Sequence, residues 1–329
     1  MDKPISSPRE VILQCLYNSE KQVSGEILAK TLGMSRTAVW KHVKQLQDQG
    51  YSISSQEGSG YKLEDRDIII PSLVMDMAGK MENITGLEHF LTLDSTNDHL
   101  KEALSPAKRS FINSGTVVVT EVQTGGKGRL GKTWCSPKGG LWFSILLRPD
   151  VHPSQLSPMT LVSGLAVVKV LASKGIDARL KWPNDILVNK KKICGILTEL
   201  TGDMDNINNL IIGIGLNVNN KPDDLSQELQ ENTTSMIIQA GNRIDRNQLL
   251  ADILKSIDRH INRYLLEGFK AFRDQWMEHA LYLNETIQVN MPGESITGKF
   301  IDITEDGCLV LEHEGEKKLI RSGIVEYVR

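Results

Sequence analysis

The sequence predicts an α+β protein with three domains. Apolar residues recur at helical spacing near the N-terminus, short apolar runs with few helices fill the middle, and turn signals divide brief strands near the C-terminus. The length of 329 residues also exceeds that of a typical single domain. We therefore expect domains over residues 1–65, 66–282 and 283–329.

The composition is that of a globular protein without a dominant charge. Hydrophobic residues make up 40%, charged residues 24%, and the net charge is −3, so any surface for nucleic acid must be local. The four cysteines form no C-x-x-C pair and the seven histidines no H-E-x-x-H motif, which argues against disulfides and zinc. The polar start, and the lack of an apolar run of roughly 20 residues, lead us to expect a cytoplasmic protein without a membrane segment.

The first 65 residues should form three helices and a hairpin. Pro8 suits the first turn of a helix, and serines that can cap a helix precede the segments Gly25–Leu32 and Arg36–Gln49. A β-hairpin is expected over residues 51–63, with its turn at 57–60. This order of elements is typical of a winged helix-turn-helix.

The third of these helices is the predicted DNA-binding element. Its buried stripe is expected at Val39, Val43 and Leu46, which leaves several cations for phosphate contacts. The residues expected to face DNA are Arg36, Thr37, Trp40, Lys41 and Lys44. A protein-docking module is the alternative. Because eight basic residues balance eight acidic ones over residues 1–65, one copy should bind weakly, and we expect a dimer that spans two half-sites.

The middle of the chain predicts a mixed or largely antiparallel sheet. The apolar runs expected to form strands are 116–120, 141–147, 178–180, 186–188, 193–200 and 210–218. Helices are expected over residues 159–173 and 245–269. Helices and strands do not alternate strictly, which favours α+β over a doubly wound sheet. After residue 285, three glycine-containing turns divide short strands and predict a small barrel.

A glycine-rich loop follows the first of these strands. Residues 126–133 satisfy both the phosphate-loop pattern G-x-x-x-x-G-K-T and the dinucleotide pattern G-x-G-x-x-G. Both motifs need a helix to begin after the loop, but residues 134–140 contain a proline and two glycines, so we reject both. The physical feature that remains is an anion-binding loop, with a solvated surface loop as the alternative. Its cations, opposed only by Glu121, are Lys127, Arg129, Lys132 and Lys138.

Other polar clusters interrupt the expected strands. Residues 94–97 could cap a helix, and residues 181–185 place a proline in a strand, so that side chains there leave the ladder. Gly213 and Gly215 should weaken their apolar strand unless another group must approach it closely. The three lysines at 190–192 would ordinarily form a solvated hairpin turn.

Six motifs in order resemble those of the biotin–protein ligases. They are S-T-N, Q-x-x-G-K-G-R-x-G-x-x-W, G-L-W-F-S-I-L-L-R-P, K-W-P-N-D, K-K-I-C-G-I-L-T-E and G-I-G-L-N. With its N-terminal module, the chain is similar over essentially its whole length to the bacterial members that also repress transcription. The resemblance implies a central domain like that of class II synthetases. It also implies an SH3-like C-terminal barrel that assists ATP and carrier binding.

The resemblance implies an activity as well as a fold. Members of the family make biotinyl-5′-AMP from biotin and ATP and transfer biotin to a lysine of a carrier domain, as in acetyl-CoA carboxylase and pyruvate carboxylase. Mg²⁺ is expected only through the ATP phosphates, with no protein metal site. Biotinyl-AMP should order the glycine loop, and because this loop runs directly into an edge-like apolar strand at 140–148, we expect the ordering to favour dimerisation through that strand. The dimer should then repress an operator of biotin genes. The alternative is a repressor that senses biotin without catalysis.

Site roles follow from matching positions in the family motifs. The residues implied to bind biotin are Ser95, Thr96, Asn97, Gln123, Lys127, Gly128, Arg129 and Lys192. Trp134 and Asn217 are implied at the adenylate, and Arg129, Lys192 and Asp185 in catalysis, with Asp185 as the candidate proton acceptor. Lys127 stands where the family often has arginine; it keeps the charge but loses the bidentate fork.

Overall fold

The computed structural model describes residues 7–56, 58–105, 112–152, 155–203, 206–224 and 227–328. The chain divides into two compact units, residues 1–79 with 245–251, and residues 80–244 with 252–329. The predicted turn residue Glu57 lies outside the described residues. None of the helices in the described part of the chain is both long and apolar enough to cross a membrane.

The first unit contains the predicted helices and hairpin. Its elements are α1 (Pro8–Tyr17), α2 (Gly25–Leu32), α3 (Arg36–Asp48), β1 (Ile53–Gln56), β2 (Gly60–Leu63) and α4 (Pro71–Ala78). The Ser24 and Ser35 hydroxyls each accept a backbone N–H at 3.2 Å, so both predicted caps are confirmed; such a cap stabilises a helix by about 1 kcal/mol. The unit also takes in the start of α9 (Arg246–Glu267), where the Asn247 side chain bonds the backbone of Ile68 and Ile70.

The third helix has the predicted division into a buried and an exposed face. Val39, Val43 and Leu46 are buried. All the residues expected to face DNA are exposed: Arg36, Thr37, Trp40, Lys41 and Lys44. Trp40 is 55% exposed, so its indole is accessible to a binding partner.

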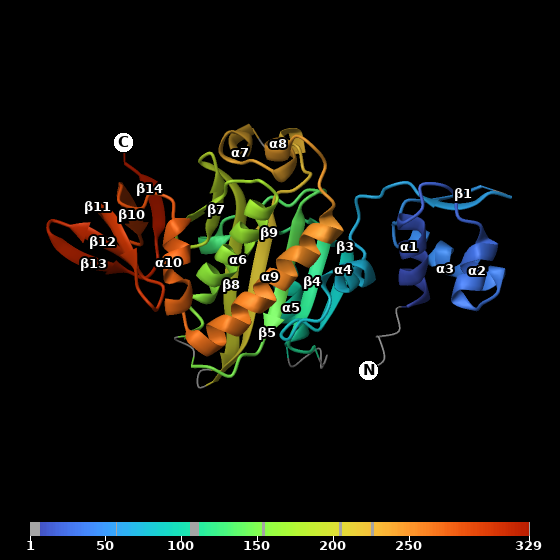
Figure 1. Ribbon diagram of the computed structural model, residues 1–329, viewed down its shortest axis with the longest axis horizontal. Coiled ribbons are helices and arrows are strands. Elements are labelled where there is room, and N and C mark those ends of the chain that lie inside the picture. Colours follow the sequence, from blue (N-terminus) through green and yellow to red (C-terminus); the bar gives the residue numbers. More distant parts are fainter. Residues whose placement is uncertain are drawn as a thin grey trace. The chain divides into compact units, whose positions relative to one another are not determined.

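The second unit is built on a mixed sheet (Figure 1). Among the described residues seven strands lie in the order β3-β4-β5-β9-β8-β7-β6, and only the β3–β4 pair is parallel. The strands are β3 (Gly86–Leu93), β4 (Thr116–Gln123), β5 (Leu141–Leu147), β6 (Arg179–Lys181), β7 (Asp185–Val188), β8 (Lys191–Asp203) and β9 (Asn206–Leu216). The predicted α+β class and mixed sheet are confirmed.

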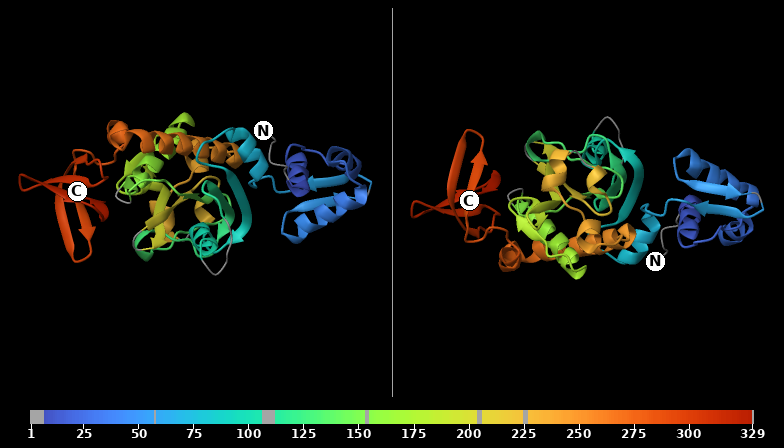
Figure 2. Two further views of the ribbon diagram at one scale, coloured as in Figure 1. Left: turned by 90° about the horizontal axis from the view of Figure 1, so that it is seen from below. Right: turned by 90° about the horizontal axis from the view of Figure 1, so that it is seen from above.

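Helices cover this sheet on its two faces. The α6 helix (Met159–Ser173) meets β8 through a bond from Thr160 to Thr198, and α9 packs on α6 through a bond from Ser256 to the carbonyl of Ala166. In both views of Figure 2 the green α6 and the orange α9 lie on the same side of the sheet. The α5 helix (Thr96–Ala103) meets β8 through Glu199, the next residue along the strand. Successive side chains of a strand point to opposite faces, so α5 lies on the face opposite to α6. The remaining helices of this unit are α7 (Gln227–Asn232), α8 (Met236–Ala240) and α10 (Lys270–Glu278).

The expectation that residues 140–148 offer an edge for dimerisation is wrong. The strand β5 pairs with β4 on one side and β9 on the other, and all its residues are buried. Within the described residues the edge strands of the sheet are β3 and β6. A continuous apolar run marks a strand covered on both faces rather than an open edge.

The C-terminal segment forms the predicted small β module. Its antiparallel strands are β10 (Thr286–Met291), β11 (Glu294–Ile303), β12 (Leu309–His313), β13 (Glu316–Ile320) and β14 (Ile324–Tyr327). They lie in the order β13-β12-β11-β10-β14. The indole N–H of Trp182 donates to the carbonyl of Gly307 at 3.0 Å, which anchors one turn of this module beside the 181–185 turn.

Candidate functional site

The glycine loop joins β4 to β5 without any helix at its end. Bridges from Gln123 to Ser136 and from Lys127 to Thr133 fold the loop back on itself. Its only helical feature among the described residues is one 3-10 turn at Arg129–Gly131. A helix N-terminus is what lets the phosphate and dinucleotide motifs bind phosphate, so their rejection is confirmed.

The expected opposition between Glu121 and the loop cations is wrong. Glu121 is buried within the sheet, and its Oε1 lies 3.0 Å from Nε2 of His89 on β3. The acid that faces the loop is Asp98 on α5, whose Oδ2 lies 2.6 Å from Nζ of Lys127. Strand alternation turned Glu121 inward, and only the fold brought Asp98 to the loop.

A pocket of about 280 Å³ lies between the glycine loop and the sheet. It is lined by the loop, the start of α5, the 181–185 turn, the strands β8 and β9, and residues 323–325 of the C-terminal module. The sequence-predicted site residues that line it are Ser95, Thr96, Asn97, Gln123, Lys127, Gly128, Arg129, Trp134, Asp185 and Lys192. Residues far apart in the sequence therefore converge on one cavity.

Two of the predicted positions do not line this pocket. Lys138, expected among the loop cations, is not part of the lining. Asn217 is buried, and its Oδ1 accepts a hydrogen bond from Asn220 at 3.1 Å. Its backbone bonds Ile193 and Met236, so its contacts hold the chain behind the pocket rather than open into it.

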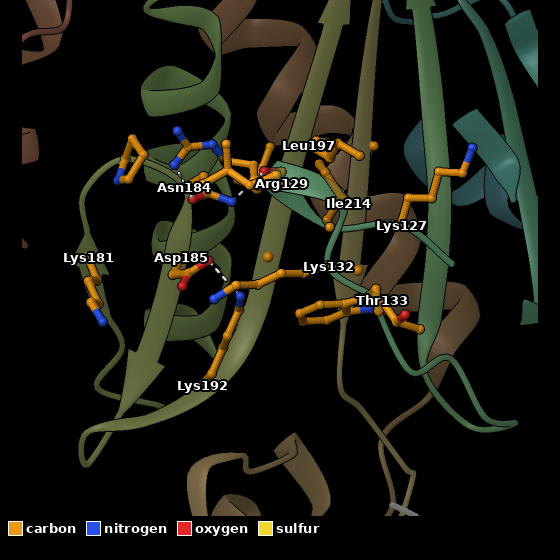
Figure 3. A pocket seen from close by; sticks show the side chains of 18 of the residues that line it. Lys127, Arg129, Lys132, Thr133, Lys181, Asn184, Asp185, Lys192, Leu197 and Ile214 are labelled. Carbon is orange, nitrogen blue, oxygen red and sulfur yellow. Dashed lines mark hydrogen bonds and ion pairs between the residues drawn. The ribbon is translucent and has the colours of Figure 1, made fainter. Parts of the chain in front are cut away.

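One end of the pocket holds a cluster of cations. Lys192 Nζ lies 2.7 Å from Asp185 Oδ1 and 4.9 Å from the centroid of the Trp134 ring. Figure 3 shows Asp185 and Lys192 pointing toward each other, whereas Lys127 points away from them. Burial lowers the pKa of Lys181; Asp185 partly offsets this effect, and the neighbouring lysines add to it. An anion at this end would therefore meet several partly desolvated positive charges.

Arg129 connects the loop to two other walls. Its guanidinium donates to Asn184 Oδ1 at 3.2 Å, to Ser322 Oγ at 3.0 Å and to the carbonyl of Gly323 at 3.4 Å. Burial lowers the pKa of this guanidinium, and Asp185 partly compensates. All these partners are neutral, so the charge of Arg129 is available to an anionic ligand.

The other end of the pocket is a network of neutral hydrogen-bonding groups. Gln123 Oε1 accepts from the backbone of Thr96 at 2.9 Å, and the Thr96 hydroxyl lies 2.6 Å from that of Ser144. Ser144 donates to Asn97 Oδ1 at 2.5 Å, while Ser95 caps α5. These groups can both donate and accept, as recognition of a polar, uncharged ring system requires.

The glycines of β9 make room for two of these side chains. A Cβ at Gly213 would lie 2.3 Å from Asn97 Oδ1, and one at Gly215 would lie 2.3 Å from Trp134 Nε1. A Cβ at Gly195 would also lie 3.0 Å from the indole ring. The predicted close approach at Gly213 and Gly215 is confirmed, and the approaching groups are an amide and an indole.

Sequence reasoning missed several lining residues. Lys181 and Asn184 line the pocket but were given no role. Both belong to the K-W-P-N-D string, and its proline, which interrupts a strand, was a signal that could have identified them. Ser144, which bonds Thr96 and Asn97 without lining the pocket itself, sits in an apolar run and gave no signal. Within the described residues no group of three or more His, Cys, Asp or Glu could hold a metal ion.

The comparisons with protein families divide the chain in three. The model described as the biotin/lipoate A/B protein ligase family matches residues 90–217, and an HTH domain matches residues 8–62. The model described as the biotin protein ligase C-terminal domain matches residues 282–327. These three matches lie in the same order as the three domains that the sequence predicts.

Curated relatives are similar over nearly the whole chain. The bifunctional ligase/repressor BirA of Bacillus subtilis is 35% identical over 92% of this chain and 93% of its own length. That of Escherichia coli is 31% identical over 92% of each chain. Among solved structures, the biotin protein ligase of Aquifex aeolicus in complex with biotin and ATP has a TM-score of 0.63 at 34% identity, covering 73% of this chain and 97% of its own.

Proposed function

Because the chain belongs to the biotin/lipoate A/B protein ligase family, we propose that its pocket binds biotin and ATP and joins them into biotinyl-5′-AMP. The chain is a biotin–protein ligase that also carries a DNA-binding repressor module. One observation carries the proposal for the site: a single pocket has a neutral hydrogen-bonding end and a cationic end. The first suits the ureido ring of biotin and the second suits phosphate.

The cationic end would lower the barrier to forming the adenylate. The carboxylate of biotin attacks the α-phosphorus of ATP, a new C–O–P linkage forms, and pyrophosphate leaves with the electrons of the broken P–O bond. Two anions must approach each other in this step. Arg129, Lys181 and Lys192 reduce that repulsion and stabilise charge on the transferring group.

Mg²⁺ would enter with the ATP phosphates and neutralise part of their charge. Among the residues that the structure describes, Asp185 is the one carboxylate in the pocket lining, and it is already paired with Lys192. A single paired carboxylate suits a metal held mainly by phosphate oxygens, as is usual for Mg²⁺ in nucleotide sites. Trp134 would offer its ring to the adenine, on the surface where Lys192 now lies.

The second step transfers biotin to the amine of a carrier lysine. The amine must lose a proton to attack the acyl carbon, and AMP leaves as the C–O bond breaks. Asp185 is the proposed acceptor of that proton, because no other carboxylate of the described part of the chain lines the pocket. The adenylate is labile to water, so a loop that folds over it protects it until the carrier arrives.

Regulation and cellular context extend the proposal. We propose that the carriers are the carrier domains of acetyl-CoA carboxylase and pyruvate carboxylase, and that the chain acts in the cytoplasm. Ordering of the glycine loop around biotinyl-AMP would favour a homodimer that presents two α3 helices to an operator. We place the domain limits near residues 65 and 282, which the family matches at 8–62 and 282–327 support.

A labelling experiment tests the enzymatic part. The chain is incubated with labelled biotin, MgATP and an acceptor carrier domain, and label is sought on the carrier lysine. We expect label on the carrier and one pyrophosphate released for each biotin transferred. A protein that binds biotin without releasing pyrophosphate would be the non-catalytic sensor instead.

A further inference from the structure

Lys101 joins two carboxylates behind the pocket. It lies in α5, and its Nζ is 2.6 Å from Glu199 Oε1 on β8 and 3.2 Å from Asp98 Oδ1 on its own helix. The side chains of these three residues are 20–30% exposed, so water screens them only in part. Neither carboxylate lines the pocket, but each one holds a residue that does.

Glu199 orients the amide of Asn97. Its second oxygen, Oε2, accepts from Asn97 Nδ2 at 2.7 Å, while Asn97 Oδ1 accepts from Ser144 at 2.5 Å. The amide is also in close contact with Gly213. Rotating the amide would exchange a donor for an acceptor at both ends, so the Glu199 carboxylate fixes which atoms Asn97 turns toward a ligand.

Asp98 holds the glycine loop. Its Oδ2 lies 2.6 Å from Nζ of Lys127, the loop residue that points away from the cationic cluster. Burial would raise the pKa of the Asp98 carboxyl, but hydrogen bonds from Lys127 and Lys101 outweigh it and hold the pKa below its usual value. The carboxylate therefore stays charged while it bridges two lysines.

We propose that Lys101 is a positioning residue of the biotin site, which couples the orientation of Asn97 to the closure of the glycine loop through Glu199 and Asp98. Without the ammonium group, two carboxylates on neighbouring elements lose their shared counter-ion. Each would then shift toward water, Asn97 would lose its fixed orientation, and Lys127 would lose a rigid anchor. The proposal rests on the proposed assignment of this end of the pocket to biotin.

The test compares Lys101→Met with Lys101→Arg in the full chain. Methionine keeps much of the length but removes the charge, and arginine restores the charge. We expect Lys101→Met to raise the KM for biotin and the rate of adenylate release by about 3- to 10-fold, the range for losing one ordinary hydrogen bond, because water partly screens the ion pairs of Lys101. The KM for ATP and the kcat at saturating biotin should stay within about twofold, and Lys101→Arg should recover most of the loss.

A double-mutant cycle separates coupling from simple destabilisation. Combining Lys101→Met with Lys127→Met should cost less in biotin affinity than the sum of the single changes, because both act through Asp98. The matched control is Lys174→Met, which breaks the ion pair between Lys174 and Asp252. This pair has a similar exposure, and neither of its residues lines the pocket. It should leave the KM for biotin unchanged.

Two results would overturn the proposal while leaving the proposed function intact. One is a biotin KM for Lys101→Met equal to that of the wild type, and the other is strict additivity with Lys127→Met. If Lys101→Met fails to fold, Glu199→Gln removes the charge at the same shape and should raise the biotin KM in the same direction. A wild-type chain that labels no carrier would instead contradict the proposed function itself.

Discussion

Arg129 in the glycine loop donates a hydrogen bond to the hydroxyl of Ser322, which lies 193 residues later in the C-terminal module, at 3.0 Å. The bond ties the loop to the C-terminal module, whose residues 323–325 line the pocket together with Arg129. The backbone of Gly323 accepts from the same guanidinium and also lines the cavity. The C-terminal module is therefore part of the site rather than an appendage.

Replacing Arg129 by alanine should impair both steps of the reaction. Removing one preorganised donor from a charged transition state costs about 100-fold or more in rate. We expect carrier labelling to fall by at least that factor and the adenylate to escape into solution, measured as free biotinyl-AMP. Ser322→Ala keeps the cation and removes one contact, so it should lose only about threefold. Equal losses in the two variants would show that Arg129 acts through the C-terminal module alone.

Alanine at each β9 glycine should affect a different substrate. Gly215→Ala would push its Cβ into Trp134 and raise the KM for ATP, whereas Gly213→Ala would press on Asn97 and raise the KM for biotin. Overpacking costs about 1–3 kcal/mol, or roughly 5- to 150-fold in affinity. The control is Gly86→Ala, where a Cβ meets nothing within 4 Å. If both β9 variants changed the same KM, the assignment of the two ends would be wrong.

The rate of adenylate formation should decline at alkaline pH through Lys181. Burial, partly offset by Asp185, lowers the pKa of this ammonium, so its positive charge is lost at a lower pH than that of an ordinary lysine. The kcat/KM for ATP, which reports the free enzyme, should fall on the alkaline side. Lys181→Arg stays protonated there and should move the fall to higher pH. Lys127→Arg should leave the pH of the fall unchanged, because the hydrogen bond to Asp98 already raises the pKa of Lys127 and keeps it protonated.

Operator binding should depend on Trp40 and Lys44 in different ways. Trp40→Ala should weaken binding to a selected operator by about tenfold with little effect on random DNA, since an apolar side chain in the major groove reads base edges. Lys44→Ala should weaken both and reduce the salt slope by about one, as expected for a phosphate contact. Gel-shift titrations with biotin and MgATP present measure both effects. No change in either variant would favour the protein-docking alternative for the first unit.

Ligand should change the assembly of the chain. If ordering of the glycine loop promotes the homodimer, sedimentation should shift from monomer to dimer when biotin and MgATP are added. Arg129→Ala, which should retain the adenylate poorly, should shift less at the same concentrations. A distribution that biotinyl-AMP leaves unchanged would contradict ligand-promoted dimerisation while leaving the ligase reaction untouched.

The sequence by itself determined the local elements. Ser24 and Ser35 each stand directly before a helical run, and each caps the helix that follows. The apolar run of 141–147 forms β5 with the predicted bounds. Gly213 and Gly215, inside an apolar strand, predicted that other groups approach this strand closely, and Asn97 and Trp134 do so. Each of these features depends on a few neighbouring residues, so the signal is complete within a short stretch of sequence.

Only the tertiary structure decided which side chains meet. Glu121 points inward and pairs with His89, so Asp98 is the acid that pairs with Lys127. The strand β5 lies inside the sheet and not at its edge. Ser144 reached Asn97 and Arg129 reached Ser322 across long stretches of chain. These pairings follow from strand order and register, which depend on the packing of the whole sheet and not only on the neighbouring residues in the sequence.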